Sequence, residues 1–469
     1  MFETSTHGAT RSRAKISSAA CGSMLAALLL AGCGNNYRPV VTGTSPVGPA
    51  SQPVKYAVAV SDPGSSQSGL VTFVDFSGDT VITQPAVQTA PNYIVLNGSA
   101  ETTASYGYTI NAAGTLSEFG VSSPNTLLTS QILTSTLPTT ATPTNIASIS
   151  LLNSTGTVFV PEVGANLLAS LTTTGQLVQE IATPARPQYI VGMNSTPRIY
   201  VLNANNTASS IEANATTGLT LTSNITVGTN PVYGIMTSDL RRAFVVNKGS
   251  QTVSVINVVN NALDSTTPTI TIPTVTDSGG NNISTNPVWA DINPLTNELV
   301  VLSAGDGTHG GMVSVFNIPL CSAAAQASNP TCNADNPVDG TNFGTLVSTV
   351  PVGVNPTQLQ VLRDSTTPRA YVANSGNGST NGSVSVVNLN TGVVSATIPT
   401  VADSTTLSTP SIFGVHPSTL AVTTGSPTGK VYVTSTDSRY LTIIETDDDT
   451  VFTHAPIYGT GVRVVVTAP

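Results

Sequence analysis

Short runs of alternating hydrophobic and polar residues recur along most of the chain, separated by turns rich in Gly, Asn, Ser and Thr. Residues 242–257 show the pattern: an Arg-Ala-Phe-Val-Val-Asn run, a Lys-Gly-Ser-Gln turn and a Thr-Val-Ser-Val-Ile-Asn run. Alternation with a period of two indicates a β-strand, and a Gly-containing turn between two such runs indicates a hairpin. Residues 369–389 and 430–446 repeat this arrangement. The pattern therefore predicts an all-β protein.

The predicted strands fall into units of four that recur about every 50 residues, a period typical of repeat architectures. A proline-marked junction opens each unit after the first. Proline fixes φ and has no backbone N–H, so it suits the first residue of a strand. These junctions contain Pro91, Pro143, Pro187, Pro231, Pro287, Pro356 and Pro410.

Four antiparallel strands per unit, arranged in a ring, make the blades of a β-propeller. The first unit, from Lys55, lacks an innermost strand, and the C-terminal run 462–467 supplies a spare one. Pairing the two would close the ring and leave no open sheet edge. The junctions predict eight blades. Seven is the alternative, because residues 91–137 follow the repeat weakly.

The repeats resemble the YVTN-repeat β-propeller family, in which a Tyr-Val-x-Asn strand precedes a Val-Ser-Val-Ile-Asp-like strand. Residues 371–374 read Tyr-Val-Ala-Asn and residues 383–388 read Ser-Val-Ser-Val-Val-Asn. Residues 198–203 and 244–257 match clearly, whereas 55–140 match poorly. The resemblance implies the propeller fold and only loosely a binding function. Bacterial lactonases similar to this family hydrolyse sugar lactones, so a lactonase-like hydrolase is an alternative function.

Only 8% of the 469 residues are charged, against roughly a quarter in a typical soluble domain. Thr, Ser, Asn, Gly and Val take their place, and these residues favour strands and turns over helices. Fifteen basic and 24 acidic residues give a net charge of −9. This balance argues against a nucleic-acid partner, which requires a clustered basic surface.

Residues 1–32 have the pattern of an export signal, with a basic segment followed by an apolar run too short to span a membrane. The run ends in Leu-Ala-Gly-Cys33, which resembles the lipobox of bacterial lipoproteins. The resemblance implies cleavage before Cys33 and acylation of that residue; an ordinary secretory leader is the alternative. Residues 33–54 would then be a flexible tether. We expect a lipid-anchored envelope protein, in the outer rather than the inner membrane because Gly34 is not an acidic retention signal.

Cys321 and Cys332 lie in the largest insertion, residues 317–344, within unit six. In an oxidising compartment such an even pair favours a disulfide. A zinc site is the rival interpretation, but no nearby His or C-x-x-C motif supports it.

Candidate metal sites are weak. Asp306 and His309 share a glycine-rich hairpin tip, and residues 447–449 are three consecutive Asp. Neither has the ligand number or spacing of an established site, and solvated turns are the favoured interpretation. No metal and no cofactor is predicted.

One set of residues suggests a binding site. The second residue after each junction proline begins an innermost strand, and innermost strands line the channel of a propeller. Four of the eight are aromatic, including the only Trp, in a chain with 5% aromatic residues. Such residues are enriched at recognition sites, although they could instead plug the channel. The set is Tyr93, Asn145, Tyr189, Tyr233, Trp289, Gln358, Ile412 and, in the closing strand, Arg463. The predicted ligand-binding residues are Tyr93, Tyr189, Tyr233, Trp289, Gln358 and Arg463.

Acid–base groups near this mouth are few: Arg463, with Asp291 or Glu162 nearby. A hydrolase needs a denser cluster, so the sequence favours a non-enzymatic monomer that binds an envelope protein or ligand at one face of the ring. Its other partner would be the membrane, through the anchor. A surface or adhesion protein is a further alternative without a specific motif.

Overall fold

The computed structural model describes residues 55–64, 66–97, 106–111, 114–121, 133–136, 147–149, 157–193, 196–214, 218–319, 342–363, 367–403, 411–423 and 429–467. All of them belong to one compact unit. They form strands and turns and contain no helix. Within these ranges there is accordingly no helical segment that could cross a membrane.

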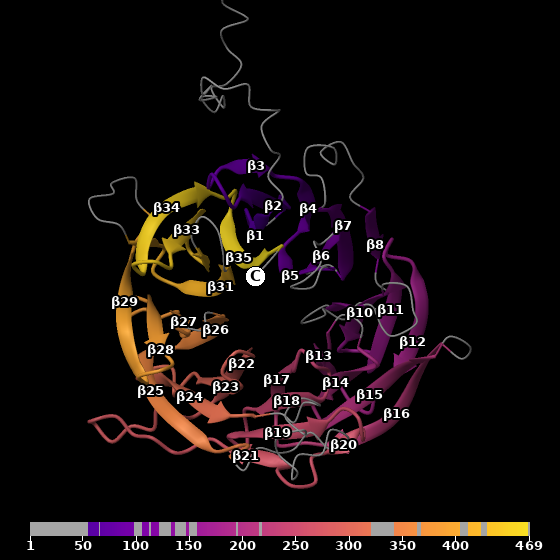
Figure 1. Ribbon diagram of the computed structural model, residues 1–469. Coiled ribbons are helices and arrows are strands. Elements are labelled where there is room, and N and C mark those ends of the chain that lie inside the picture. The colour runs from indigo at the N-terminus through magenta and orange to yellow at the C-terminus, as the bar shows by residue number, and fades with distance from the viewer. Residues whose placement is uncertain are drawn as a thin grey trace, which may run out of the picture. The chain divides into compact units, whose positions relative to one another are not determined.

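Eight small antiparallel sheets are arranged around a central axis, and the sheets are the blades of a β-propeller (Figure 1). The prediction of an all-β, eight-bladed propeller is confirmed. The weakly repetitive second unit forms its own four-stranded sheet, β5 to β8, which decides between eight blades and seven.

The blades are numbered in chain order and their strands are given from the channel outwards. Blade 1 consists of β35 (Thr460–Val466), β1 (Tyr56–Asp62) and β2 (Ser68–Asp75), with β3 (Val81–Thr83) and β4 (Ala86–Thr89) outside β2. Blade 2 consists of β5 (Pro91–Leu96), β6 (Tyr106–Asn111), β7 (Thr115–Gly120) and β8 (Leu133–Thr136), and blade 3 of β9 (Ala147–Ile149), β10 (Thr157–Glu162), β11 (Leu167–Thr172) and β12 (Leu177–Ala182). Blade 4 consists of β13 (Pro187–Val191), β14 (Arg198–Asn203), β15 (Thr207–Asn214) and β16 (Gly218–Thr226).

Blade 5 consists of β17 (Pro231–Met236), β18 (Arg242–Asn247) and β19 (Thr252–Asn257), with β20 (Ala262–Leu263) and β21 (Thr269–Thr271) outside β19. Blade 6 consists of β22 (Pro287–Asn293), β23 (Glu298–Ser303), β24 (Gly310–Asn317) and β25 (Leu346–Val354), and blade 7 of β26 (Pro356–Leu362), β27 (Arg369–Asn374), β28 (Ser383–Asn388), β29 (Val393–Val401) and β30 (Ile412–Phe413). Blade 8 consists of β31 (Pro417–Thr423), β32 (Lys430–Ser435), β33 (Tyr440–Glu445) and β34 (Thr450–Pro456).

The C-terminal strand closes the ring, as predicted. β35 pairs antiparallel with β1, with Val58 opposite Val465, and becomes the innermost strand of blade 1. The first and last strands of the described chain therefore share one sheet. This pairing satisfies backbone groups that would otherwise form an open edge.

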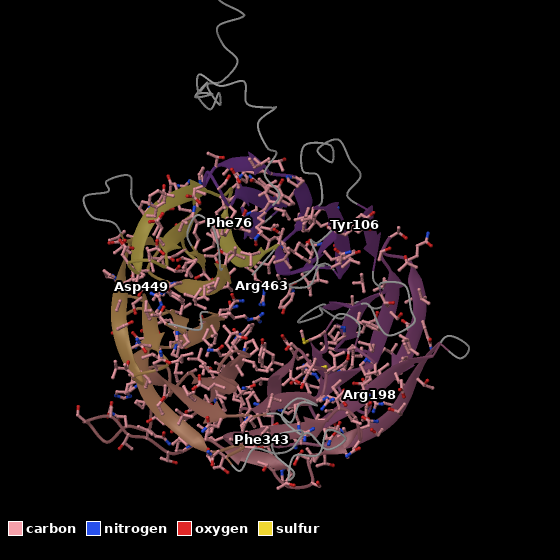
Figure 2. All side chains as sticks on the ribbon, viewed as in Figure 1. Phe76, Tyr106, Arg198, Phe343, Asp449 and Arg463 are labelled. Carbon is pink, nitrogen blue, oxygen red and sulfur yellow. The ribbon has the colours of Figure 1, made fainter. Side chains whose placement is uncertain are left out.

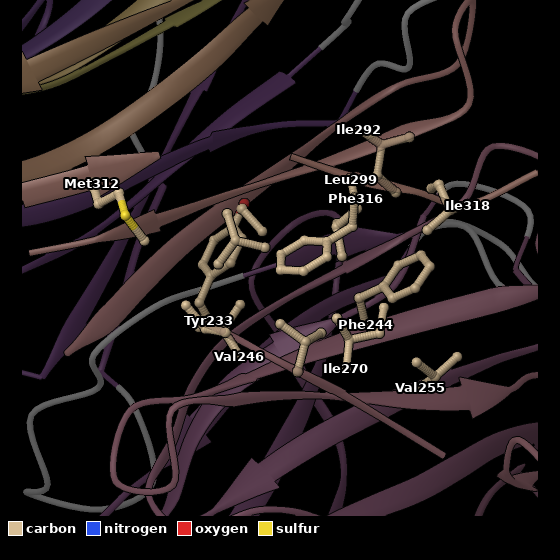
Figure 3. Close-up of a cluster of buried hydrophobic side chains, with 14 of the residues drawn as sticks. Tyr233, Phe244, Val246, Val255, Ile270, Ile292, Leu299, Met312, Phe316 and Ile318 are labelled. Atoms are coloured by element: carbon tan, nitrogen blue, oxygen red, sulfur yellow. The ribbon is translucent and has the colours of Figure 1, made fainter. Parts of the chain in front are cut away.

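The hydrophobic core lies between the blades. Eight clusters of buried side chains occur, one at each contact between neighbouring blades. Figure 3 shows the cluster between blades 5 and 6. Every residue of β18 is buried because a neighbouring blade covers each face of its sheet, whereas the outermost strand β16 alternates between exposed and half-buried positions over most of its length.

Proline begins the innermost strand in six blades, and a β-bulge follows it in each case. The prediction is wrong for blade 8, whose innermost strand begins at Pro417 and not at Pro410. Ile412 instead lies in β30, which pairs in parallel with the outermost strand of blade 7. Residues 415–418, Val-His-Pro-Ser, span the start of β31 and form a second junction pattern seven residues after Pro410.

The Asn that ends the repeated Tyr-Val-x-Asn strand is buried and has a structural role. Each ends the second strand of a blade and donates from its side-chain amide to a Ser hydroxyl on the third strand. Such bonds satisfy amide groups that have left water. They join Asn203 to Ser209 at 2.8 Å, Asn247 to Ser254 at 3.0 Å and Asn374 to Ser385 at 2.9 Å.

In blades 7 and 8, the basic residue that begins the second strand forms an ion pair with an Asp of the next blade. Arg369 lies 2.7 Å from the Asp449 carboxylate, which also accepts a hydrogen bond from the Tyr371 hydroxyl. Lys430 contacts Asp79 in the same way, so this pair joins blade 8 to blade 1. Both Asp residues occupy turns with positive φ. The expectation of a solvated turn at residues 447–449 is thus wrong for Asp449.

The insertion of unit six lies between β24 and β25, as the sequence indicated. Cys321 and Cys332 are outside the described residues, and so is Cys33.

Candidate functional site: the channel mouth

The two ends of the ring carry different connections. We call the end at which the innermost strands begin the junction face; it also carries the hairpins between the second and third strands. The other end, where innermost strands finish, is the opposite face. The six predicted ligand-binding residues lie in innermost strands, toward the junction face, and Figure 2 shows Arg463 at the centre of the propeller.

Three aromatic side chains from consecutive blades stack along one side of the mouth. The Tyr189 and Tyr233 ring centroids are 4.9 Å apart, and the Tyr233 and Trp289 centroids are 4.0 Å apart with an interplanar angle of 25°. Offset aromatic pairs at such distances stabilise a structure beyond the area they bury. The structure therefore brings these three predicted residues together.

Arg463 continues the stack across the channel. Its guanidinium carbon lies 4.2 Å from the Tyr93 ring centroid and 5.4 Å from that of Trp289. These residues come from blades 1, 2 and 6, so the contacts span the mouth. Cation–π attraction holds the guanidinium between the two rings.

No carboxylate neutralises this cation within the described ranges, where Arg463 takes part in none of the six ion pairs. Its Nε atom is buried and has no hydrogen-bond partner there. The side chain as a whole is half-buried. An unneutralised guanidinium with an accessible part is suited to an anionic group.

The hydroxyls of Tyr189 and Tyr233 stay protonated near neutral pH. Burial raises the pKa of Tyr189 well above its usual value, and the Tyr233 phenol adds to that shift. Burial likewise raises the pKa of Tyr233, while the positive charge of Arg463 opposes both shifts. Neither phenol can therefore act as a base near neutral pH.

Polar side chains occupy the other side of the mouth, where they satisfy backbone groups of the next blade. Gln358 is 2% exposed, and its side-chain oxygen accepts a hydrogen bond of 3.1 Å from the Leu420 N–H. Equivalent bonds run from the Val422 N–H to Gln360 and from the Val464 N–H to Thr419. Gln358 therefore lies in the predicted ring but serves the contact between blades.

Asp291 has a similar structural role. One carboxylate oxygen accepts a hydrogen bond from the Val361 N–H and the other from the Ile292 N–H, both at 2.8 Å. Burial raises its pKa in spite of these bonds and of the nearby Arg363 charge. Glu162, at the end of β10, is 1% exposed.

One residue of the ring differs from the prediction, and another is not tested. Asn145 lies outside the described residues, so its place in the ring stays a prediction. Thr419 occupies the position assigned to Ile412, because Pro417 opens the strand. The Val-His-Pro-Ser junction was the signal that could have identified it.

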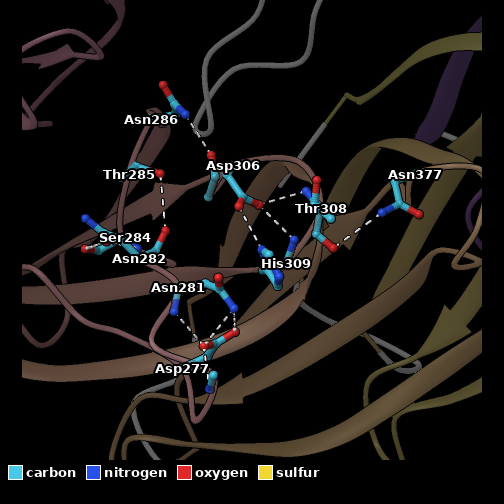
Figure 4. Close-up of polar contacts among 12 residues, drawn as sticks. Asp277, Asn281, Asn282, Ser284, Thr285, Asn286, Asp306, Thr308, His309 and Asn377 are labelled. Atoms are coloured by element: carbon cyan, nitrogen blue, oxygen red, sulfur yellow. Dashed lines mark hydrogen bonds and ion pairs between the residues drawn. The ribbon is translucent and has the colours of Figure 1, made fainter.

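A second polar cluster on the junction face surrounds His309 (Figure 4). The His309 ring lies 2.7 Å from the Asp306 carboxylate, which also accepts N–H bonds from Thr308 and from His309. These hydrogen bonds lower the pKa of Asp306 to about 2. The described part of the chain holds no group of three or more His, Cys, Asp or Glu residues suited to a metal.

No protein-family model matches the chain, and no curated protein sequence matches it. Several solved structures do. The dihydro-heme d1 dehydrogenase NirN, bound to DHE, is 11% identical over 91% of this chain and 78% of its own, with a TM-score of 0.58. AztD of Citrobacter koseri is 11% identical over 88% and 97%, with a TM-score of 0.51. A Bacteroides fragilis protein, a candidate 6-phosphogluconolactonase, is 14% identical over 75% of this chain and 96% of its own, with a TM-score of 0.48. The similarities to NirN and AztD show the fold alone: the chain is a β-propeller.

Proposed function

We propose that this protein is a non-enzymatic, lipid-anchored propeller of the cell envelope that binds a partner at the junction face. The partner presents an anionic group to Arg463. The resemblance of the repeat motifs to YVTN-repeat propellers gives loose support to a binding role, and the lipobox-like sequence at Cys33 supports the anchor.

The observation that carries the binding proposal is the state of Arg463. Its guanidinium is oriented by two aromatic rings, and no described carboxylate pairs with it. A side chain fixed in this way loses little conformational freedom on binding an anion, and the flanking rings limit competition from water.

Hydrolysis fits this mouth less well. A general base must be able to approach the water or substrate whose proton it takes. Backbone N–H bonds to both oxygens hold the Asp291 carboxylate between β22 and β26, and the Tyr189 and Tyr233 phenols are protonated. The groups that could support lactone hydrolysis are thus engaged in the structure of the ring.

The binding proposal is tested with the only tryptophan as reporter. Trp289 contacts Arg463, so its fluorescence should change saturably when a polyglutamate peptide is titrated into the full chain. Arg463→Met should weaken this response by about tenfold or more, since it removes the cation. Arg439→Met is the matched control, because Arg439 is a 72% exposed arginine on the same face. An equal loss in both variants, or no saturable response, would overturn the proposal.

The anchor is tested separately. Cys33→Ala should prevent acylation and release the protein from the membrane fraction, and a detergent-phase partition assay would measure this. Full retention of the variant in membranes would contradict the proposal.

A further inference from the structure

Exposed hydrophobic side chains are concentrated at one end of the propeller. Ten large hydrophobic residues are exposed within the described ranges. Only Tyr458, which lies in the turn before β35, belongs to the junction face. The others are Tyr106, Leu177, Val178, Val259, Leu295, Leu346, Val347, Val393 and Phe452.

The strand directions place these nine residues at the opposite face. An outermost strand starts there, because the strands of a blade alternate in direction. Five of the residues are the first or second residues of β12, β25 and β29, and Phe452 is the third residue of β34. The remaining three lie at the start of β6 and in turns on the same face: Tyr106, Val259 and Leu295.

The chain enters the propeller at this same face. β1 is the second strand of blade 1 and begins at Tyr56, so Lys55 lies on the opposite face. The segment that follows Cys33 therefore joins the ring on the side that carries the exposed hydrophobic residues.

We propose that the opposite face lies against the lipid bilayer, with its exposed apolar side chains in the interface. This inference rests on the proposed lipid anchor. The anchor alone does not fix an orientation, because some 20 extended residues can reach about 70 Å. The apolar side chains supply the preference, since each gains free energy on leaving water for the interfacial region. Exposed charges of both signs lie on this face, Asp447 and Asp448 together with Lys55 and Arg363, so a zwitterionic surface suits it.

This orientation has a consequence for binding. The junction face, with Arg463 and the aromatic stack, would point away from the membrane. A soluble or periplasmic partner could then reach the mouth while the protein stays anchored.

Tryptophan quenching by brominated lipid tests the orientation. The full acylated chain, in a Trp289→Phe background, is placed on phosphatidylcholine vesicles with brominated acyl chains. Phe452→Trp and Leu177→Trp place tryptophan reporters on the opposite face, near the starts of the outermost strands of blades 8 and 3. Tyr458→Trp is the matched control on the junction face, because Tyr458 and Phe452 are 53% and 58% exposed. Each variant is compared with itself on unbrominated vesicles.

We expect about twofold quenching of both opposite-face reporters and none of the control. Vesicle flotation of the same samples separates this inference from the anchor. A chain that floats without quenching of either opposite-face reporter, or with equal quenching of the control, overturns the orientation and leaves the anchor intact; a protein partner would then cover this face. A chain that does not float overturns the anchor, and the orientation with it.

Discussion

Glu118 provides a quantitative test of the packing between strands in blade 2. It lies in β7 opposite Tyr108, is 7% exposed, and one of its carboxylate oxygens is buried with no hydrogen-bond partner among the described residues. Burial raises its pKa from 4.5 to about 7. At about 1.36 kcal/mol per pKa unit, this rise corresponds to at most roughly 3 kcal/mol. Solvent near the partly accessible group screens the effect, so we expect about 1–2 kcal/mol.

The direction of the effect follows from proton binding. Between pH 4.5 and about 7 the folded protein holds a proton on Glu118 that the unfolded chain has released. The free energy of unfolding therefore falls as pH rises through this window. Glu118→Gln removes the ionisation and keeps the shape. The variant should be about 1–2 kcal/mol more stable than the wild type at pH 8 and equally stable at pH 4.

Urea unfolding followed by circular dichroism at both pH values measures the difference. Glu180→Gln, at an exposed position of β12, is the control and should leave stability unchanged at both. A stabilisation of Glu118→Gln that is the same at pH 4 and pH 8 would refute the reasoning, because it would not arise from ionisation.

Two further predictions concern the contacts between and within blades. Lys430→Met should destabilise the ring by about 3–5 kcal/mol, because it leaves the Asp79 carboxylate buried without its cation, and the added Asp79→Asn should restore most of this loss; additive single effects in urea unfolding would contradict the pairing. Asn374→Ala should cost about 1–2 kcal/mol through the lost bond to the Ser385 hydroxyl. A calorimetric transition unchanged from the wild type would show that this amide does not stabilise the blade.

The repeat pattern was sufficient to predict the fold because each blade is built from local contacts. Its hairpins depend on turns within a few residues, and its junction prolines depend on local backbone geometry. Closure by β35 was predictable because the first unit lacked a strand and the C-terminus supplied one. Pro417 shows the limit of this reasoning, since two proline junctions lay close together and only the pairing of β30 with β29 separated them.

The site was only partly predictable. The sequence alone placed Tyr93, Tyr189, Tyr233, Trp289 and Arg463 at equivalent positions of innermost strands, because a repeat with fixed length sets which residues share a level of the channel. It did not determine that Arg463 reaches across to Trp289, or that Gln358 caps a backbone N–H of the next blade. Those contacts join residues from different blades, and their distances depend on the closed ring. The composition and period of the chain therefore determine a propeller of eight blades. Tertiary packing decides which polar groups form hydrogen bonds between blades, and that the Arg463 cation lies at the mouth without an ion-pair partner among the described residues.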